Sequence, residues 1–152
     1  MIGVGGILVG ALIGGIAQAW VQRSKNQHDE RTRRKERAEE VLTLVAASPW
    51  WYTPIKKAAL QDPSNFPTPP TEPHRVFALV ALYFPGALES AQKFELACVS
   101  YLVSLQEIAK LVKQEQPVPP DVKNPATFDA LYVARQALID AMRREVDPNS
   151  AG

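Results

Sequence analysis

The chain has 152 residues and a mass of 16.7 kDa; 46% of its residues are hydrophobic and 22% are charged. This length leaves room for about one small domain, and the composition excludes an intrinsically disordered chain. The formal net charge of +1 excludes no class of protein by itself, because the charged residues are unevenly distributed along the chain. The glycines are unevenly distributed too. The single cysteine, Cys98, excludes an intramolecular disulfide, and we expect it to be a buried thiol.

The opening segment, MIGVGGILVGALIGGIAQAW, contains no charged residue and six of the eight glycines. Twenty residues of helix span roughly 30 Å, the thickness of the hydrocarbon core of a bilayer. Glycine is costly in a water-exposed helix but common in transmembrane helices. We therefore predict a transmembrane helix over residues 1–22. Small residues recur on one side of it and predict a helix-association face formed by Gly6, Gly10, Gly14 and Gly15.

Three alternatives remain open for this segment, and one of them is a helix buried in protein contacts. Ala17-Gln18-Ala19 fits the small-x-small rule for signal-peptide cleavage, which would release a secreted helical protein. Against cleavage, Lys and Arg are absent before the apolar run and follow it directly. The glycine-rich helices could instead assemble into a membrane-permeabilising pore, although the segment has no polar stripe to line a water-filled channel.

Residues 23–48 are predicted to form a basic juxtamembrane helix that leads into a bundle. The excess of Lys and Arg over acids just after the apolar run places this stretch in the cytoplasm and the amino terminus outside the inner (cell) membrane. Interrupting acids and the lack of interleaved aromatics count against nucleic acid as a partner. The basic residues predicted to contact the membrane surface are Arg23, Lys25, Arg31, Arg33 and Arg34.

Residues 49–75 are rich in proline and aromatic residues. Ser48-Pro49 is expected to end the first helix, and Thr53-Pro54 reads as an N-cap and first helical position of a short helix through about Leu60. Trp50, Trp51 and Tyr52 are interpreted as core or groove residues.

Residues 76–147 are predicted to form the helical bundle, and residues 148–152 a disordered tail. VFALVALYF predicts a short buried helix that ends near Pro85, and a helix of about thirty residues follows it. A last helix begins at Asn124-Pro125. The long helix carries apolar residues at alternating steps of three and four, which predicts a buried seam. The seam residues chosen from this pattern are Phe84, Phe94, Cys98, Tyr101, Leu105 and Ile108.

The chemistry of known active sites is not evident in the sequence. His28 and His74 have no potential ligand partner nearby in sequence, and Ser90 and Lys93 match a serine-acylase spacing without its companion motifs. We therefore predict no catalytic, cofactor-binding or metal-binding residues, no small-molecule substrate, and a protein that is not an enzyme.

The segments LYFPGALESA (82–91) and ALIDAMRREV (137–146), with the apolar start and the basic stretch after it, resemble small bacterial proteins that have one membrane span and a helical cytoplasmic domain. This resemblance implies neither an activity nor a cofactor. The expected fold is all-α: a transmembrane helix, a basic stalk and a bundle of about three to four helices. The expected partners are the lipid bilayer and a protein partner or further copies of the chain.

Overall fold

The computed structural model describes the backbone of residues 4–119 and 125–147, and the side chains of residues 25, 28–119 and 125–147. Within these ranges the chain forms helices and turns without β-strands, so the fold is all-α as predicted. The chain divides into two compact units, Met1–Glu36 and Arg37–Gly152.

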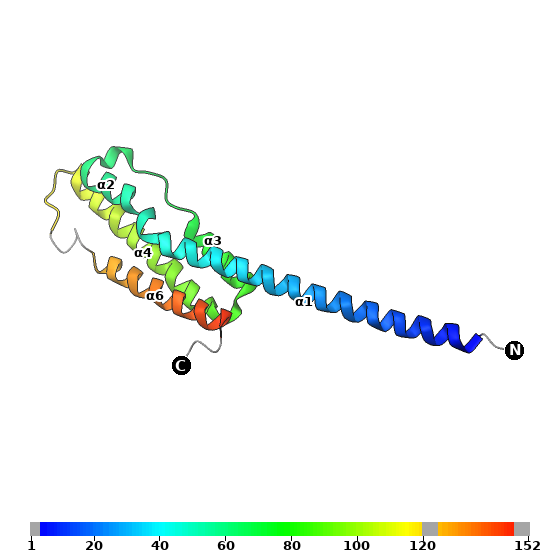
Figure 1. The fold of residues 1–152 in the computed structure, drawn as a ribbon. Helices are drawn as coiled ribbons and strands as arrows, with labels where there is room; N and C mark the ends of the chain where they lie inside the picture. Colours follow the sequence, from blue (N-terminus) through cyan, green and yellow to red (C-terminus); the bar gives the residue numbers. More distant parts are fainter. Residues whose placement is uncertain (1–3, 120–124, 148–152) are drawn as a thin grey trace. The chain divides into compact units, whose positions relative to one another are not determined.

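The first unit consists of the amino-terminal part of helix α1, which runs from Val4 to Trp51 (Figure 1). Its described side chains are all exposed. Among the described residues, no helix combines the length and the hydropathy that crossing a membrane requires. The predicted association face (Gly6, Gly10, Gly14 and Gly15), the cleavage motif at 17–19 and Arg23 lie outside the described side chains, and the tail at 148–152 lies outside the described residues.

The prediction that Ser48-Pro49 ends the first helix is wrong, because α1 continues through Pro49 to Trp51. Proline has no N–H, so the carbonyl of Val45 loses its normal α-helical donor. Arg135 supplies the donors instead: its Nε donates to the Val45 oxygen at 3.0 Å and its Nη2 donates to the Ala46 oxygen at 3.2 Å. A tertiary contact therefore supports the helix where local sequence would end it.

The second unit is a helical bundle around α4 (Leu88–Lys113). Helix α4 contacts α2 (Thr53–Gln61), α3 (Glu72–Tyr83) and α6 (Ala126–Val146), as Figure 1 shows. Short 3₁₀ turns at Pro63–Asn65 and Pro85–Ala87 follow α2 and α3. Thr53 does not act as the predicted N-cap of α2, because its hydroxyl donates to the Pro49 oxygen at 3.3 Å.

The core of the bundle consists of apolar side chains from α1, α2, α3, α4 and α6. The buried residues of α4 recur at steps of three and four, so one side of the helix faces the core along most of its length. Burial of such faces is the main driving force of helix packing in water. The largest side chains that are fully or almost fully buried include Phe84, Phe94, Tyr101, Ile55, Leu105, Ile108, Leu138 and Met142.

A cluster of charged side chains links α1 to α3 at the surface of the bundle. Glu40 accepts hydrogen bonds from Arg37 at 2.6 Å and from Arg75 of α3. The hydrogen bonds from these guanidinium groups, Arg37 first, lower the pKa of the Glu40 carboxyl. The Arg37 guanidinium also lies 5.9 Å from the centre of the Tyr83 ring. Because both arginines are solvent-exposed, we assign the cluster a role in local positioning rather than a large share of the stability.

Candidate functional site

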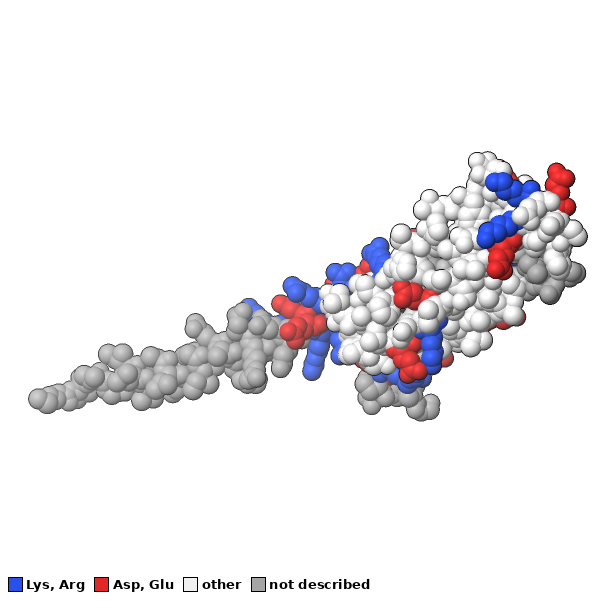
Figure 2. All heavy atoms as spheres, turned by 180° about the vertical axis from the view of Figure 1, so that it is seen from behind, with Lys and Arg blue, Asp and Glu red and all other residues white. Residues whose placement is uncertain are grey.

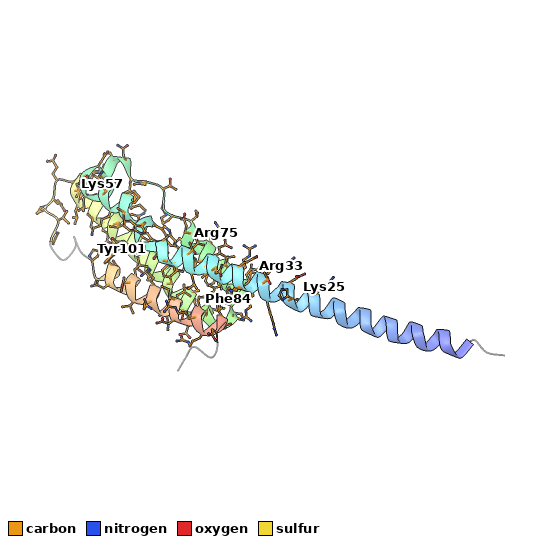
Figure 3. All side chains as sticks on the ribbon, viewed as in Figure 1. Lys25, Arg33, Lys57, Arg75, Phe84 and Tyr101 are labelled. Atoms are coloured by element: carbon orange, nitrogen blue, oxygen red, sulfur yellow. The ribbon has the colours of Figure 1, made fainter. Side chains whose placement is uncertain are left out.

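The predicted basic residues Lys25, Arg31, Arg33 and Arg34 are exposed on α1. Lys25 and Arg33 are labelled in Figure 3, and Figure 2 shows blue and red atoms crowded together on this helix beside the undescribed residues. Acidic side chains share the surface, so it is a mixed rather than a purely cationic one.

The six predicted seam residues lie in the bundle core, none more than 2% exposed. Five of them are on α4, and Phe84 lies just after α3. Their positions are those of packing residues. Tyr101 differs from the others because it also lines a pocket.

This pocket, here called the aromatic pocket, lies where the end of α1 meets the starts of α2 and α6. Its volume is about 280 Å³. Trp50 is 74% exposed and Phe128 is 44% exposed, whereas Tyr52 and Tyr101 are buried. The pocket therefore has a buried aromatic base and an open aromatic rim. Its lining residues are Pro49, Trp50, Tyr52, Thr53, Lys56, Tyr101 and Phe128.

Three of these rings form a contiguous row. The ring centres of Tyr52 and Tyr101 are 5.3 Å apart in an edge-to-face arrangement, and those of Tyr101 and Phe128 are 5.4 Å apart. Such spacings are within the favourable range for aromatic pairs. The row joins the α1–α2 corner, α4 and α6, so the three elements define the shape of the pocket together.

Lys56 gives the aromatic pocket its charge. Its Nζ lies 5.9 Å from the centre of the Phe128 ring, and its side chain is half-buried. Among the described residues that line the pocket there is no carboxylate. The neighbouring Lys57, labelled in Figure 3, is exposed and does not line it. One cation beside an aromatic row favours ligands that combine an apolar body with negative charge.

The polar groups beneath the aromatic pocket remain neutral at physiological pH. Burial raises the pKa of the Cys98 thiol to about 11, despite a hydrogen bond with Tyr52 that acts in the opposite direction. Burial also raises the pKa of the Tyr52 and Tyr101 hydroxyls. A protonated buried thiol is a poor nucleophile, so Cys98 has the chemistry of a packing residue.

The side of α4 that faces away from the core carries three apolar residues among polar ones such as Gln92 and Gln106. Leu96, Val99 and Val103 follow one another at steps of three and four and are 59%, 45% and 46% exposed. We call these three residues the outer face of α4. No other described helix covers them. Contiguous exposed apolar surface of this kind marks interaction sites in soluble domains.

The remaining candidates from the sequence are not brought into a cluster. The Nδ1 of His74 lies 2.5 Å from the Oε1 of Glu95 in an exposed pair between α3 and α4. Lys93 pairs with Glu89 at 2.6 Å in the described structure. Among the described residues, no three His, Cys, Asp or Glu side chains form a group that could hold a metal ion.

The sequence singles out only some of the pocket residues and does not bring them together. It predicts Tyr101 in the seam and Trp50 and Tyr52 in a core or groove, whereas it gives Lys56 and Phe128 no role in a site. Their common location depends on the α1–α2 corner meeting α6, which lies more than 70 residues away in the chain. The signal available in the sequence was the unusual run Trp50-Trp51-Tyr52 beside a proline.

No known protein family, no curated protein and no solved structure matches this chain. What the structure defines is therefore a class of architecture, an all-α protein with a helical bundle.

Proposed function

We propose that this protein is a non-enzymatic, single-span protein of the inner (cell) membrane whose cytoplasmic helical bundle binds a protein partner at the membrane. The uncharged residues 1–22 and the basic residues after them support the anchor and its orientation. Anchoring raises the effective concentration of the bundle for partners in the same membrane. The pairing of anchor helices through the glycine face belongs to this proposal.

The observation that carries the interaction role is the outer face of α4. Leaving Leu96, Val99 and Val103 exposed to water is unfavourable by roughly 25 cal/mol for each Å² of apolar surface. A partner that packs an apolar helix face against this stripe would recover that free energy. The partner is thus expected to present an amphipathic helix, and a second copy of the chain has such helices.

The anchor is tested by the intact mass of the protein in separated membrane and soluble fractions of the expressing cell. A full-length chain in the membrane fraction is the expected result. A soluble species that begins at Trp20 would overturn the proposal, because it would establish cleavage after Ala19 and a secreted protein.

The interaction role is tested by photo-cross-linking in intact membranes, with a photoreactive residue at Val99. The matched control carries the same residue at Val133 of α6, which is 68% exposed. We expect an adduct of defined mass from position 99 alone, which is lost on Leu96→Glu and retained on Leu82→Glu. An adduct of twice the chain mass identifies a second copy as the partner. Equal labelling from positions 99 and 133 would refute the interaction role.

A further inference from the structure

The aromatic pocket is separate from the outer face of α4. The outer face lies on the side of α4 opposite the core, whereas Tyr101 reaches the pocket from the core side of the same helix. A ligand of the pocket would therefore bind at a different place from the proposed protein partner.

The volume of the pocket limits the size of the ligand. At about 280 Å³ it lies near the lower end of the usual range for small-molecule sites. A folded protein segment or a cofactor of dinucleotide size would not fit in it. One aromatic ring with a short polar arm is a suitable size.

The lining residues limit the chemistry of the ligand. Trp50 and Phe128 at the rim are 74% and 44% exposed and offer ring surface to a flat apolar body above the buried aromatic base. Lys56 stands beside Phe128 with no carboxylate among the described lining residues to neutralise it. A cationic ligand would be repelled, and a neutral ligand would leave this charge without a counterion. A carboxylate on the ligand would satisfy it.

The position of the pocket adds to this preference. Thr53 and Lys56 belong to the first turn of α2, and Phe128 belongs to the first turn of α6. Among the described residues, no side chain caps the amino terminus of α6. This amino end carries partial positive charge, which favours a negative group, whereas the amino end of α2 directly follows the carboxyl end of α1, whose partial charge is opposite.

We infer that the aromatic pocket binds a small aromatic monocarboxylate, with its ring against Trp50 and Phe128 and its carboxylate at Lys56. This inference goes beyond the interaction role and does not depend on it. The sequence alone indicated no small-molecule ligand, because the residues concerned come from separate helices.

The test is a titration of the full-length chain in lipid nanodiscs with 3-(4-fluorophenyl)propionate, followed by ¹⁹F NMR. The neutral 3-(4-fluorophenyl)propionamide has the same shape and serves as the matched ligand, and empty nanodiscs correct for partition into lipid. For a ligand of this size we expect a dissociation constant on the order of 1 mM or below. The amide should bind about fivefold more weakly, since a half-buried charge pair contributes about that factor.

Two lysine variants locate the carboxylate. Lys56→Met keeps the apolar stem and should remove the preference for the acid over the amide, while Lys57→Met should retain it. Phe128→Ala should weaken both ligands by about tenfold, with circular dichroism used to verify the fold. Because both lysines lie outside the apolar core, their variants test the inference even if Phe128→Ala unfolds the bundle.

Three outcomes would overturn the inference. They are equal affinity for acid and amide, equal effects of Lys56→Met and Lys57→Met, and no binding above that of empty nanodiscs. None of them bears on cross-linking from Val99, so failure of this inference is distinguishable from failure of the proposed function.

Discussion

Leu82 and Phe84 lie two residues apart at the end of α3 in opposite environments. The Leu82 side chain is 75% exposed, whereas Phe84 is fully buried between the helices. The cost of truncating a side chain depends on the contacts that it loses and on the cavity that it leaves. The two positions are therefore a matched pair for testing where the core lies.

We expect Phe84→Ala to lower the free energy of unfolding by about 3–5 kcal/mol. Leu82→Ala should change it by no more than about 0.5 kcal/mol. Urea denaturation of the full-length chain followed by circular dichroism measures both. Similar losses from the two variants would contradict the placement of Phe84 in the core.

The buried hydroxyls and thiol at the base of the aromatic pocket predict a pH dependence. The pKa of Cys98 is raised from 9.0 to about 11 by burial, so folding favours the protonated thiol. A raised folded-state pKa contributes stability that is fully present below pH 9 and is lost as the pH rises through about 11. Tyr52 and Tyr101 act in the same direction, because burial raises their pKa values too.

The urea midpoint of the bundle should therefore decline as the pH is raised from 9 towards 11. The decline should be smaller in Cys98→Ala, which has no thiol to ionise. A midpoint that is constant over this range, or a decline that is the same in Cys98→Ala, would show that the thiol is not held neutral by the fold.

At the scale of elements, the corner between α1 and α2 depends on α6. Pro49 removes the donor for the Val45 carbonyl, and Arg135 replaces it at 3.0 Å. The same side chain lies with its guanidinium 5.7 Å from the centre of the Tyr132 ring. Because Trp50, Tyr52 and Thr53 follow directly after Pro49, this contact also positions one side of the aromatic pocket.

We expect Arg135→Met to lower the free energy of unfolding by about 1–3 kcal/mol, because it leaves a backbone carbonyl without a donor. In a Pro49→Ala background the new N–H can bond to the Val45 oxygen. Arg135→Met should therefore lower the free energy of unfolding by less in this background. The loss caused by Arg135→Met with Pro49 present should exceed the loss in the Pro49→Ala background by more than roughly 0.5 kcal/mol in a urea double-mutant cycle. Additive effects would mean that Arg135 does not compensate for the proline.

At the scale of the whole molecule, the described core belongs to one unit. Every buried apolar residue of the described chain lies between Ala38 and Met142, and this range falls within the unit Arg37–Gly152. A unit with its own core is expected to fold by itself.

A fragment of residues 37–152 should therefore unfold cooperatively, with a urea midpoint close to that of the full chain. Its near-ultraviolet circular dichroism should retain the signal of the packed aromatic residues. A fragment with helical far-ultraviolet signal but no near-ultraviolet signal would be a molten state. That result would contradict the independence of the bundle.

The helices that hold the core were predictable to a large extent. The alternation of steps of three and four from Phe84 to Ile108 defines one apolar side of a helix, and periodicity is a local property of the sequence. The same holds for α2, whose start is marked by Pro54, and for most of α3, which the apolar run VFALVALYF predicts; α3 begins at Glu72, before the predicted bundle boundary at residue 76. The end of α1 was not predictable, because the donors that support Pro49 come from Arg135, about 90 residues further along the chain.

The sequence by itself determined the all-α class, the apolar side of α4 and the uneven distribution of glycine and charge, because each depends on neighbouring residues alone. Only the tertiary structure decided that α1 passes through Pro49, that no other helix of the described chain covers the outer face of α4, and that Tyr52, Lys56, Tyr101 and Phe128 share one pocket. Each of these depends on which helices pack together, and the packing energy is a sum over contacts between residues far apart in the chain.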